Sequence, residues 1–150
     1  MPRLPLLLLS AVVVACQPMA TPSAAPPSSA PSMAMTNGFP TGTYTTTIVA
    51  GDIPSAASAE ERAGLAGPWE VAFGSNGHAL VTYNGQQVAD ATYSLSGRDL
   101  TLGEDTGEYA CHSPARYTWH AAGGELHLTP VADTCVGRQT VLSAHPLVRR

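Results

Sequence analysis

The side chains that could do chemistry are scattered along this sequence, and few stand at a spacing that a reaction requires. His120 and His127 could face each other across a predicted hairpin, but a zinc site needs more protein ligands than two, and no third is assured nearby. Glu104, Asp105 and Glu108 could offer oxygen atoms to calcium, but their spacing matches no EF-hand loop. We therefore expect exposed histidines, a solvated acidic loop and no metal site.

Motifs for catalysis are absent from the sequence. It contains no Gly-x-Ser-x-Gly elbow for an activated serine, no glycine-rich phosphate loop and no Cys-x-x-Cys redox pair. The formal net charge of -4 argues against a basic face for phosphates, so no nucleic-acid partner is expected. The expectation is a protein that is not an enzyme and carries no cofactor.

The N-terminus has the layout of an export signal. Arg3 supplies a positive charge, and residues 4–14 form an apolar run that is too short to span a bilayer as a helix. Residues 13–16 read Val-Val-Ala-Cys and resemble the lipobox of bacterial lipoproteins. This resemblance implies that residues 1–15 are a signal peptide and that Cys16 is acylated. The lipid would anchor the chain in a bilayer of the cell envelope outside the cytoplasm, on the periplasmic face or the cell surface. The alternative is an ordinary signal peptide that is cut after Ala15.

The segment that follows Cys16 has the composition of a spacer. Residues 17–38 are rich in proline, serine and alanine, and they contain no charged or aromatic side chain. Such a segment buries too little apolar area to offset the entropy of ordering it. We expect residues 16–38 to form a lipidated, disordered tether and residues 39–150 to form the folded domain.

Two further cysteines, Cys111 and Cys135, lie in the predicted folded domain. Two cysteines in an exported domain most often pair, because the compartment is oxidising. We predict a disulfide that ties the segment before the sixth strand to the loop before the eighth, with Cα atoms within about 7 Å of each other.

The folded domain reads as all-β with one helix. Ser58 and Glu61 form a possible capping box, which predicts a short helix over residues 59–65 after the first strand. Tight turns are predicted at residues 84–85 (Asn-Gly) and 123–124 (Gly-Gly). The predicted strands cover residues 43–49, 69–73, 78–83, 86–95, 100–102, 116–121, 125–131 and 138–143.

Short connections favour one way of arranging these strands. An eight-stranded meander leaves two exposed edges, and closing it into an up-and-down antiparallel barrel removes both of them. A barrel of this size holds side chains or one small ligand. A sandwich is the alternative, but it needs longer crossovers than this chain offers.

The last hairpin predicts which side chains face inward. A two-residue turn at residues 123–124 pairs Trp119 with Leu128 and His120 with His127. The residues that then share the interior face are Tyr117, Trp119, Leu126 and Leu128.

The phase of the hairpin at residues 84–85 stays open. A two-residue turn places Leu80 on the same face as Ala89 and Ala91. A three-residue turn with a bulge places Ala79 and Val81 on that face instead.

Three segments carry a resemblance to the lipocalin-like, or calycin, barrels that occur in bacterial lipoproteins. They are residues 65–69, 93–102 and 117–119, and residues 67–69 (Gly-Pro-Trp) are similar to the Gly-x-Trp that closes the bottom of lipocalins. The resemblance covers about residues 39–145. It implies a barrel with an apolar interior.

The sequence is therefore compatible with two alternative functions. The first is a barrel that binds a small apolar or amphipathic ligand without catalysis, with contacts from Tyr93, Tyr117, Trp119, Leu126 and Leu128. Tyr44 and Arg116 are candidates for orienting polar groups. The second is a barrel that its own side chains fill, whose surface meets another envelope protein, as an inhibitor for example.

Overall fold

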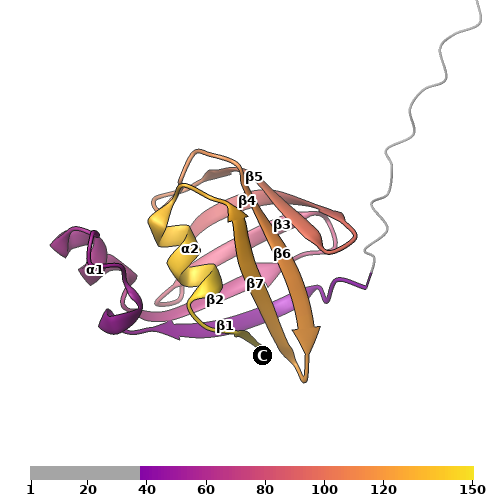
Figure 1. Ribbon diagram of the computed structural model, residues 1–150, viewed down its shortest axis with the longest axis horizontal. Coiled ribbons are helices and arrows are strands. Elements are labelled where there is room, and N and C mark those ends of the chain that lie inside the picture. Colours follow the sequence, from indigo (N-terminus) through magenta and orange to yellow (C-terminus); the bar gives the residue numbers. More distant parts are fainter. Residues whose placement is uncertain (1–37) are drawn as a thin grey trace, which may run out of the picture. The chain divides into compact units, whose positions relative to one another are not determined.

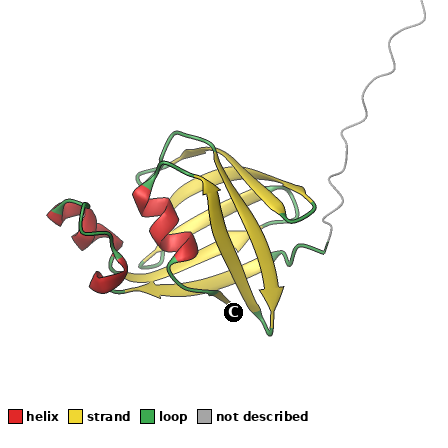
Figure 2. Ribbon diagram, viewed as in Figure 1, coloured by secondary structure: helices red, strands yellow, loops and turns green. Residues whose placement is uncertain are grey.

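The structure is a computed structural model that describes residues 38–150. This range forms a closed barrel of eight antiparallel strands in up-and-down order, in which β8 returns to pair with β1 (Figures 1 and 2). The predicted all-β barrel is confirmed. The strands are β1 (Gly42–Ile48), β2 (Gly67–Phe73), β3 (His78–Tyr83), β4 (Gln86–Ser96), β5 (Asp99–Thr106), β6 (Ala115–Ala122), β7 (Glu125–Ala132) and β8 (Leu147–Arg149). The predicted signal peptide, Cys16 and nearly all of the predicted tether lie outside the described residues.

The connection between β1 and β2 contains the predicted helix. After a 3-10 turn at Ala50–Asp52, helix α1 covers Ala59–Leu65. The Ser58 hydroxyl accepts a hydrogen bond from the Glu61 backbone N–H at 3.1 Å, and the Glu61 carboxylate accepts one from the Ser58 backbone N–H at 2.7 Å. This capping box pairs N–H groups that the first turn of a helix would otherwise leave unpaired, and it confirms the prediction.

The hairpin of β3 and β4 decides the alternative that the sequence left open. Tyr83 pairs with Gln86 across a two-residue turn, but the register shifts between Val81 and Thr82. Because of this bulge, Val81 pairs with Ala89 and Ala79 pairs with Ala91. Ala79 and Val81 therefore share the inner face with the two alanines of β4.

The hairpin of β6 and β7 has the predicted register. Trp119 pairs with Leu128 and His120 pairs with His127 across the glycine turn at residues 123–124. Tyr117, Leu126 and Leu128 are buried, and Trp119 packs against the same core. The predicted inner face of this hairpin is confirmed.

The predicted last strand is wrong. Residues 138–143 belong to helix α2 (Val136–Ser143), and the strand that closes the barrel is β8, which follows Pro146. The β-branched pair Thr140 and Val141 favours a strand locally. In the fold these two residues and Leu142 are buried within α2, so tertiary packing overrides the local preference.

Helix α2 covers the part of the barrel seam that β8 does not reach. The short β8 pairs with only two residues on each neighbour, which are Tyr44 and Thr45 of β1 and Glu125 and Leu126 of β7. Helix α2 contacts both β7 and β1, and Figure 1 shows it beside β7. A helix therefore lies over the rest of the seam between β7 and β1.

The two ends of the barrel are built differently. Because the strands run up and down, the connections alternate between the ends. The end with α1, the loop of residues 107–114 and the first turn of α2 is called the open end here. The end with the turns at residues 74–77, 97–98 and 123–124 is called the closed end.

Aromatic rings fill the closed end. Phe39 lies 5.2 Å from the ring of Phe73, 5.7 Å from that of Tyr93 and 5.2 Å from that of Trp119, measured between ring centroids. The Tyr93 hydroxyl donates to the Gly74 carbonyl at 2.7 Å, and the Trp119 indole N–H donates to the Gly97 carbonyl at 3.2 Å. Each polar group on these rings is thus satisfied by a turn of the closed end.

Candidate functional site

A cavity of about 610 Å³ occupies the open end of the barrel. Its lining comes from the inner face of β2 to β5, from α1 and α2, and from the loop of residues 107–114. The apolar side chains that line it are Leu65, Trp69, Val71, Phe73, Ala79, Val81, Val88, Ala89, Ala91, Leu102, Val141 and Leu142. The wall is therefore largely apolar.

Small side chains on β3 and β4 leave this space open. Ala79 faces Ala91 and Val81 faces Ala89 across the two strands, and all four line the cavity. Larger side chains at these inward positions would occupy the volume. The bulge between Val81 and Thr82 is what brings these small residues inward, so the local register creates the cavity.

Gly107 determines the path of the loop of residues 107–114, which borders the opening, or mouth, of the cavity. Its φ is 119°, and a Cβ atom at this position would lie 2.4 Å from the carbonyl oxygen of Val88. Only glycine, which has no Cβ atom, avoids this clash. Two residues on, the backbone N–H of Tyr109 donates to that same carbonyl at 3.0 Å. The loop therefore folds back over the start of β4 and brings Glu108 and Tyr109 to the cavity.

Three aromatic rings gather at the open end. The ring centroid of Trp69 lies 4.5 Å from that of Tyr83 and 6.0 Å from that of Tyr109. The Trp69 indole donates to the carbonyl of Leu65 at 2.8 Å, and the Tyr83 hydroxyl donates to the carbonyl of Ala66 at 2.7 Å. These bonds hold two of the rings against the end of α1, while Tyr109 remains 40% exposed.

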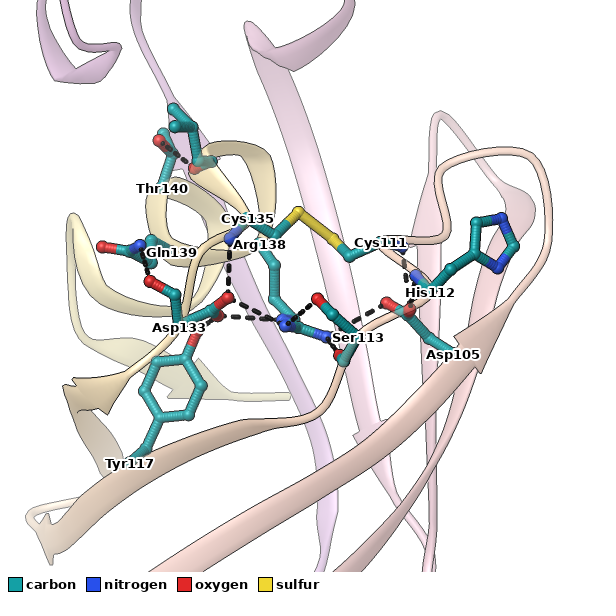
Figure 3. Close-up of a disulfide and its surroundings, with 11 residues drawn as sticks. Asp105, Cys111, His112, Ser113, Tyr117, Asp133, Cys135, Arg138, Gln139 and Thr140 are labelled. Carbon is teal, nitrogen blue, oxygen red and sulfur yellow. Dashed lines mark hydrogen bonds and ion pairs between the residues drawn. A yellow bond between two sulfur atoms is a disulfide. The ribbon is translucent and has the colours of Figure 1, made fainter.

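The predicted disulfide is confirmed and lies at the cavity. Cys111 and Cys135 are bonded, with their Cα atoms 5.9 Å apart (Figure 3). Both cysteines belong to the cavity lining. The bond ties the loop of residues 107–114 to the residue that precedes α2.

Beside the disulfide, a buried arginine holds the open end together. Two nitrogen atoms of the Arg138 guanidinium donate to the two carboxylate oxygens of Asp133, each at 2.8 Å (Figure 3). A third nitrogen donates to the backbone carbonyl of Ser113 at 2.8 Å and approaches Asp105 at 3.5 Å. The guanidinium therefore joins α2 to β5 and to the loop that leads into β6.

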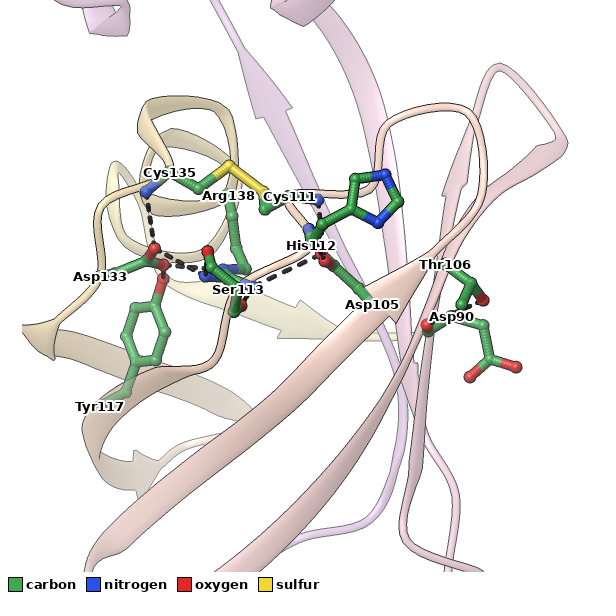
Figure 4. Close-up of polar contacts among 10 residues, drawn as sticks. All are labelled: Asp90, Asp105, Thr106, Cys111, His112, Ser113, Tyr117, Asp133, Cys135 and Arg138. Carbon is green, nitrogen blue, oxygen red and sulfur yellow. Dashed lines mark hydrogen bonds and ion pairs between the residues drawn. A yellow bond between two sulfur atoms is a disulfide. The ribbon is translucent and has the colours of Figure 1, made fainter.

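Asp105 differs from the expectation of a solvated acidic loop. It is only 5% exposed, and one of its carboxylate oxygens accepts hydrogen bonds from the backbone N–H groups of Cys111 and His112, each at 2.8 Å (Figure 4). Glu104 and Glu108 are exposed, as expected. Asp105 thus fixes the loop at its disulfide, and the expectation was wrong for this residue.

The charges in this network are set by their partners. Burial works against the charge of Asp133, but hydrogen bonds from Arg138 and Tyr117 outweigh it and hold the pKa of Asp133 below its ordinary value. Burial, together with the hydrogen bond to Asp133, raises the pKa of Tyr117 well above its ordinary value. At neutral pH the cluster therefore contains an ionised Asp133, a charged Arg138 and a neutral Tyr117.

The five residues predicted to contact a ligand do not line this cavity. Tyr93 and Trp119 belong to the aromatic cluster of the closed end. The Tyr117 hydroxyl donates a hydrogen bond to Asp133, the partner of Arg138. Leu126 and Leu128 lie in the packed core. The cavity uses a different part of the barrel interior, which alternation along the strands does not distinguish from the filled part.

The other polar residues considered as candidates lie away from the cavity. The Tyr44 hydroxyl donates to the Pro40 carbonyl, and Arg116 is exposed. His120 and His127 lie side by side on the outer face, with ring centroids 5.2 Å apart. Within residues 38–150, no group of three or more histidine, cysteine or acidic side chains could hold a metal ion.

No protein-family model matches this chain, and neither a curated protein nor a solved structure matches it. The fold and the cavity define its class: a closed eight-stranded antiparallel barrel, consistent with a lipocalin-like fold, that is filled at one end and hollow at the other. None of the helices in the described part of the chain is long and apolar enough to cross a membrane.

Proposed function

We propose that this chain is a lipid-anchored lipoprotein of the bacterial envelope whose barrel binds a small apolar or amphipathic molecule at its open end, without catalysis. The cavity of about 610 Å³ is the observation that carries the proposal. Ligand sites in proteins span roughly 300–1,000 Å³ and are mostly apolar with a few polar groups. The wall of this cavity follows that pattern, with Asp105 and Arg138 among its lining.

The contrast between the two ends supports a ligand at the open end. The same barrel closes its other end with tightly packed aromatic rings, whereas alanine side chains line the cavity. An apolar molecule in this space would gain about 25 cal/mol for each Å² of apolar surface removed from water. Binding there requires no reactive group, and the network beside the cavity has its polar atoms paired with one another.

The proposed anchor is compatible with access to the cavity. The Val-Val-Ala-Cys sequence of residues 13–16 resembles a lipobox and supports acylation of Cys16. The described chain begins beside Phe39, whose ring lies in the closed end. A tether that joins the barrel at its closed end would leave the mouth unobstructed by the attachment point.

The anchor is tested by Cys16→Ser in the producing cell. We expect this variant to leave the membrane fraction or to accumulate as an unprocessed precursor, because no thiol remains for acylation. Labelling with a radioactive fatty acid should disappear. Labelling equal to that of the unsubstituted chain would overturn the anchor while leaving the cavity untouched.

The cavity is tested by filling it. The full chain carrying Cys16→Ser is titrated with Nile red, an uncharged apolar dye, and with a panel of fatty acids that compete with it. Ala91→Leu places a larger side chain in the cavity, and Ala122→Leu makes the same change at an exposed position outside it. We expect saturable binding that Ala91→Leu weakens by about tenfold or more and Ala122→Leu leaves unchanged.

Absence of saturable binding for every probe would overturn the proposal. It would favour the alternative function, in which the surface of the barrel binds another envelope protein. Equal weakening by both substitutions would place the binding outside the cavity.

A further inference from the structure

The mouth of the cavity is acidic. The charged side chains in its lining are four carboxylates, from Glu60, Glu61, Asp105 and Glu108, and one guanidinium, from Arg138. Glu60 and Glu108 are exposed and form no ion pair among the described residues. The Glu61 carboxylate caps α1 through the Ser58 N–H and remains ionised, since this bond lowers its pKa.

The guanidinium in the lining has no donor to spare for an anionic ligand. Arginine has five N–H donors. The nitrogen atoms of Arg138 donate twice to Asp133, twice to Ser113 and once to Asp105. A carboxylate or phosphate head group that entered the mouth would therefore find acidic side chains without a compensating cation.

Aromatic faces give a second and independent reason to expect a cation. Tyr109 lines the cavity and is 40% exposed, and it packs beside the buried Trp69, with the ring centroids 6.0 Å apart and the planes inclined at 49°. Ring faces attract ammonium groups through their quadrupole, and tryptophan and tyrosine do so most strongly. Tyr109 stands next to Glu108 on the loop, so a ring and a carboxylate border the same entrance.

From these observations we propose that the cavity selects amphiphiles with a cationic ammonium head, which lies at the acidic and aromatic mouth while an apolar tail occupies the wall formed by β2 to β5. This inference rests on the proposed function, because it needs a ligand in the cavity. It adds a selection by charge that an apolar cavity alone would not have.

The test compares ligands that share a tail and differ in the head. Decyltrimethylammonium, 1-decanol and decanoate are titrated below their micelle limits into the full chain carrying Cys16→Ser and Trp119→Phe, and the emission of Trp69 is followed. We expect decyltrimethylammonium to bind about tenfold or more tightly than decanoate, with decanol between them. The ratio of the affinities for decyltrimethylammonium and decanoate should decrease as salt is added, because salt screens the exposed charges.

Variants assign the preference to the mouth. Glu60→Gln with Glu108→Gln should reduce the ratio of the two affinities several-fold, because carboxylates that face the head are neutralised. Glu104→Gln removes a charge from an exposed position outside the lining and should leave the ratio unchanged. Tyr109→Leu should weaken the ammonium ligand more than Tyr109→Phe does, because phenylalanine keeps a ring face.

The outcomes separate this inference from the proposed function. If all three ligands bind within twofold of one another, or decanoate binds most tightly, selection by charge is overturned and the apolar cavity stands. If the variant with Glu60→Gln and Glu108→Gln keeps the full ratio of affinities, the carboxylates of the mouth do not cause the selection by charge. If none of the ligands binds and Nile red does not bind either, the proposed function is overturned, and this inference with it.

Discussion

Each end of the barrel contains one tryptophan, and the two tryptophans lie in opposite surroundings. At the closed end, Trp119 packs edge-on against Phe39, and its indole N–H is bound by a turn. At the open end, Trp69 forms part of a cavity wall and is held by the last residue of α1. The closed end is stable because its interior is filled, whereas the open end must be held by contacts around its rim.

The rim contacts are the disulfide and the Arg138 network. A cavity forfeits the dispersion contacts that a filled core would make, so an open end needs other ties. Here the Cys111–Cys135 disulfide and the hydrogen bond from Arg138 to the Ser113 carbonyl join the loop of residues 107–114 to the start of α2. The ion pair of Arg138 with Asp133 holds the segment before α2 in the same network. We conclude that packing stabilises one end and that covalent and ionic contacts stabilise the other.

The substitution with the largest expected effect is Arg138→Met. It leaves the carboxylate of Asp133 fully buried without its charge partner, which costs about 4 kcal/mol of unfolding free energy. Urea unfolding measures the loss. Arg116→Met, at an exposed position on β6, is the control and should change stability by less than about 0.5 kcal/mol. Equal losses of stability in the two variants would show that the Arg138 network does not stabilise the open end.

The matching change at the closed end is Phe39→Ala. Phe39 is 4% exposed and contacts three other rings, so its truncation should cost about 3 kcal/mol. In contrast to changes at the rim, it should leave the affinity for Nile red within twofold. A loss of affinity as large as that caused by Ala91→Leu would show that the two ends are not separate.

Removal of the disulfide should have a comparable effect. Cys111 and Cys135 are separated by 24 residues, and closing a loop of this size contributes about 3.5 kcal/mol in the chain-entropy model. We expect the double alanine variant to lose this much stability in urea. It should also exchange the amide protons of residues 107–114 faster, while the turns of the closed end remain protected. Uniformly faster exchange would contradict a local role.

The smallest expected effect depends on pH. The raised pKa of Tyr117 means that the folded protein holds this proton more tightly than the unfolded chain does. The resulting stability is complete below the ordinary tyrosine pKa of about 10 and is lost as the pH rises above it. We therefore expect Tyr117→Phe to cost about 1 kcal/mol at pH 7, and the difference from the unsubstituted chain should shrink above pH 10. A difference that is constant with pH would contradict the shift.

The sequence predicted much of the fold because its signals are local. The turns at residues 84–85 and 123–124 and the capping box at Ser58 each depend on a few adjacent residues. The last predicted strand failed because α2 depends on distant contacts. Cys135 provides no side-chain cap at its start, and the burial of residues 140–142 against the barrel supports the helix instead.

The site was harder to predict than the fold for a geometric reason. Alternation along a strand tells which side chains point inward, but it does not tell how far along the barrel axis they lie. Tyr93 and Trp119 were correctly placed inside, yet they fill the closed end. The small inward side chains of Ala89 and Ala91 are the one feature of the sequence that could have indicated where the cavity lies. The burial of Asp105 and Arg138 had no signal at all, because it arises from contacts between distant segments.

The two tryptophans allow the most direct test of the central claim, which is that a ligand binds at the open end. Two variants of the Cys16→Ser chain are compared, one with Trp119→Phe, which retains Trp69, and one with Trp69→Phe, which retains Trp119. Decyltrimethylammonium is added to each, and equilibrium dialysis measures its binding independently. We expect a saturable change in the emission of Trp69 and no change in that of Trp119 at equal occupancy. A saturable change of Trp119 alone, or bound ligand that alters neither emission, would contradict it.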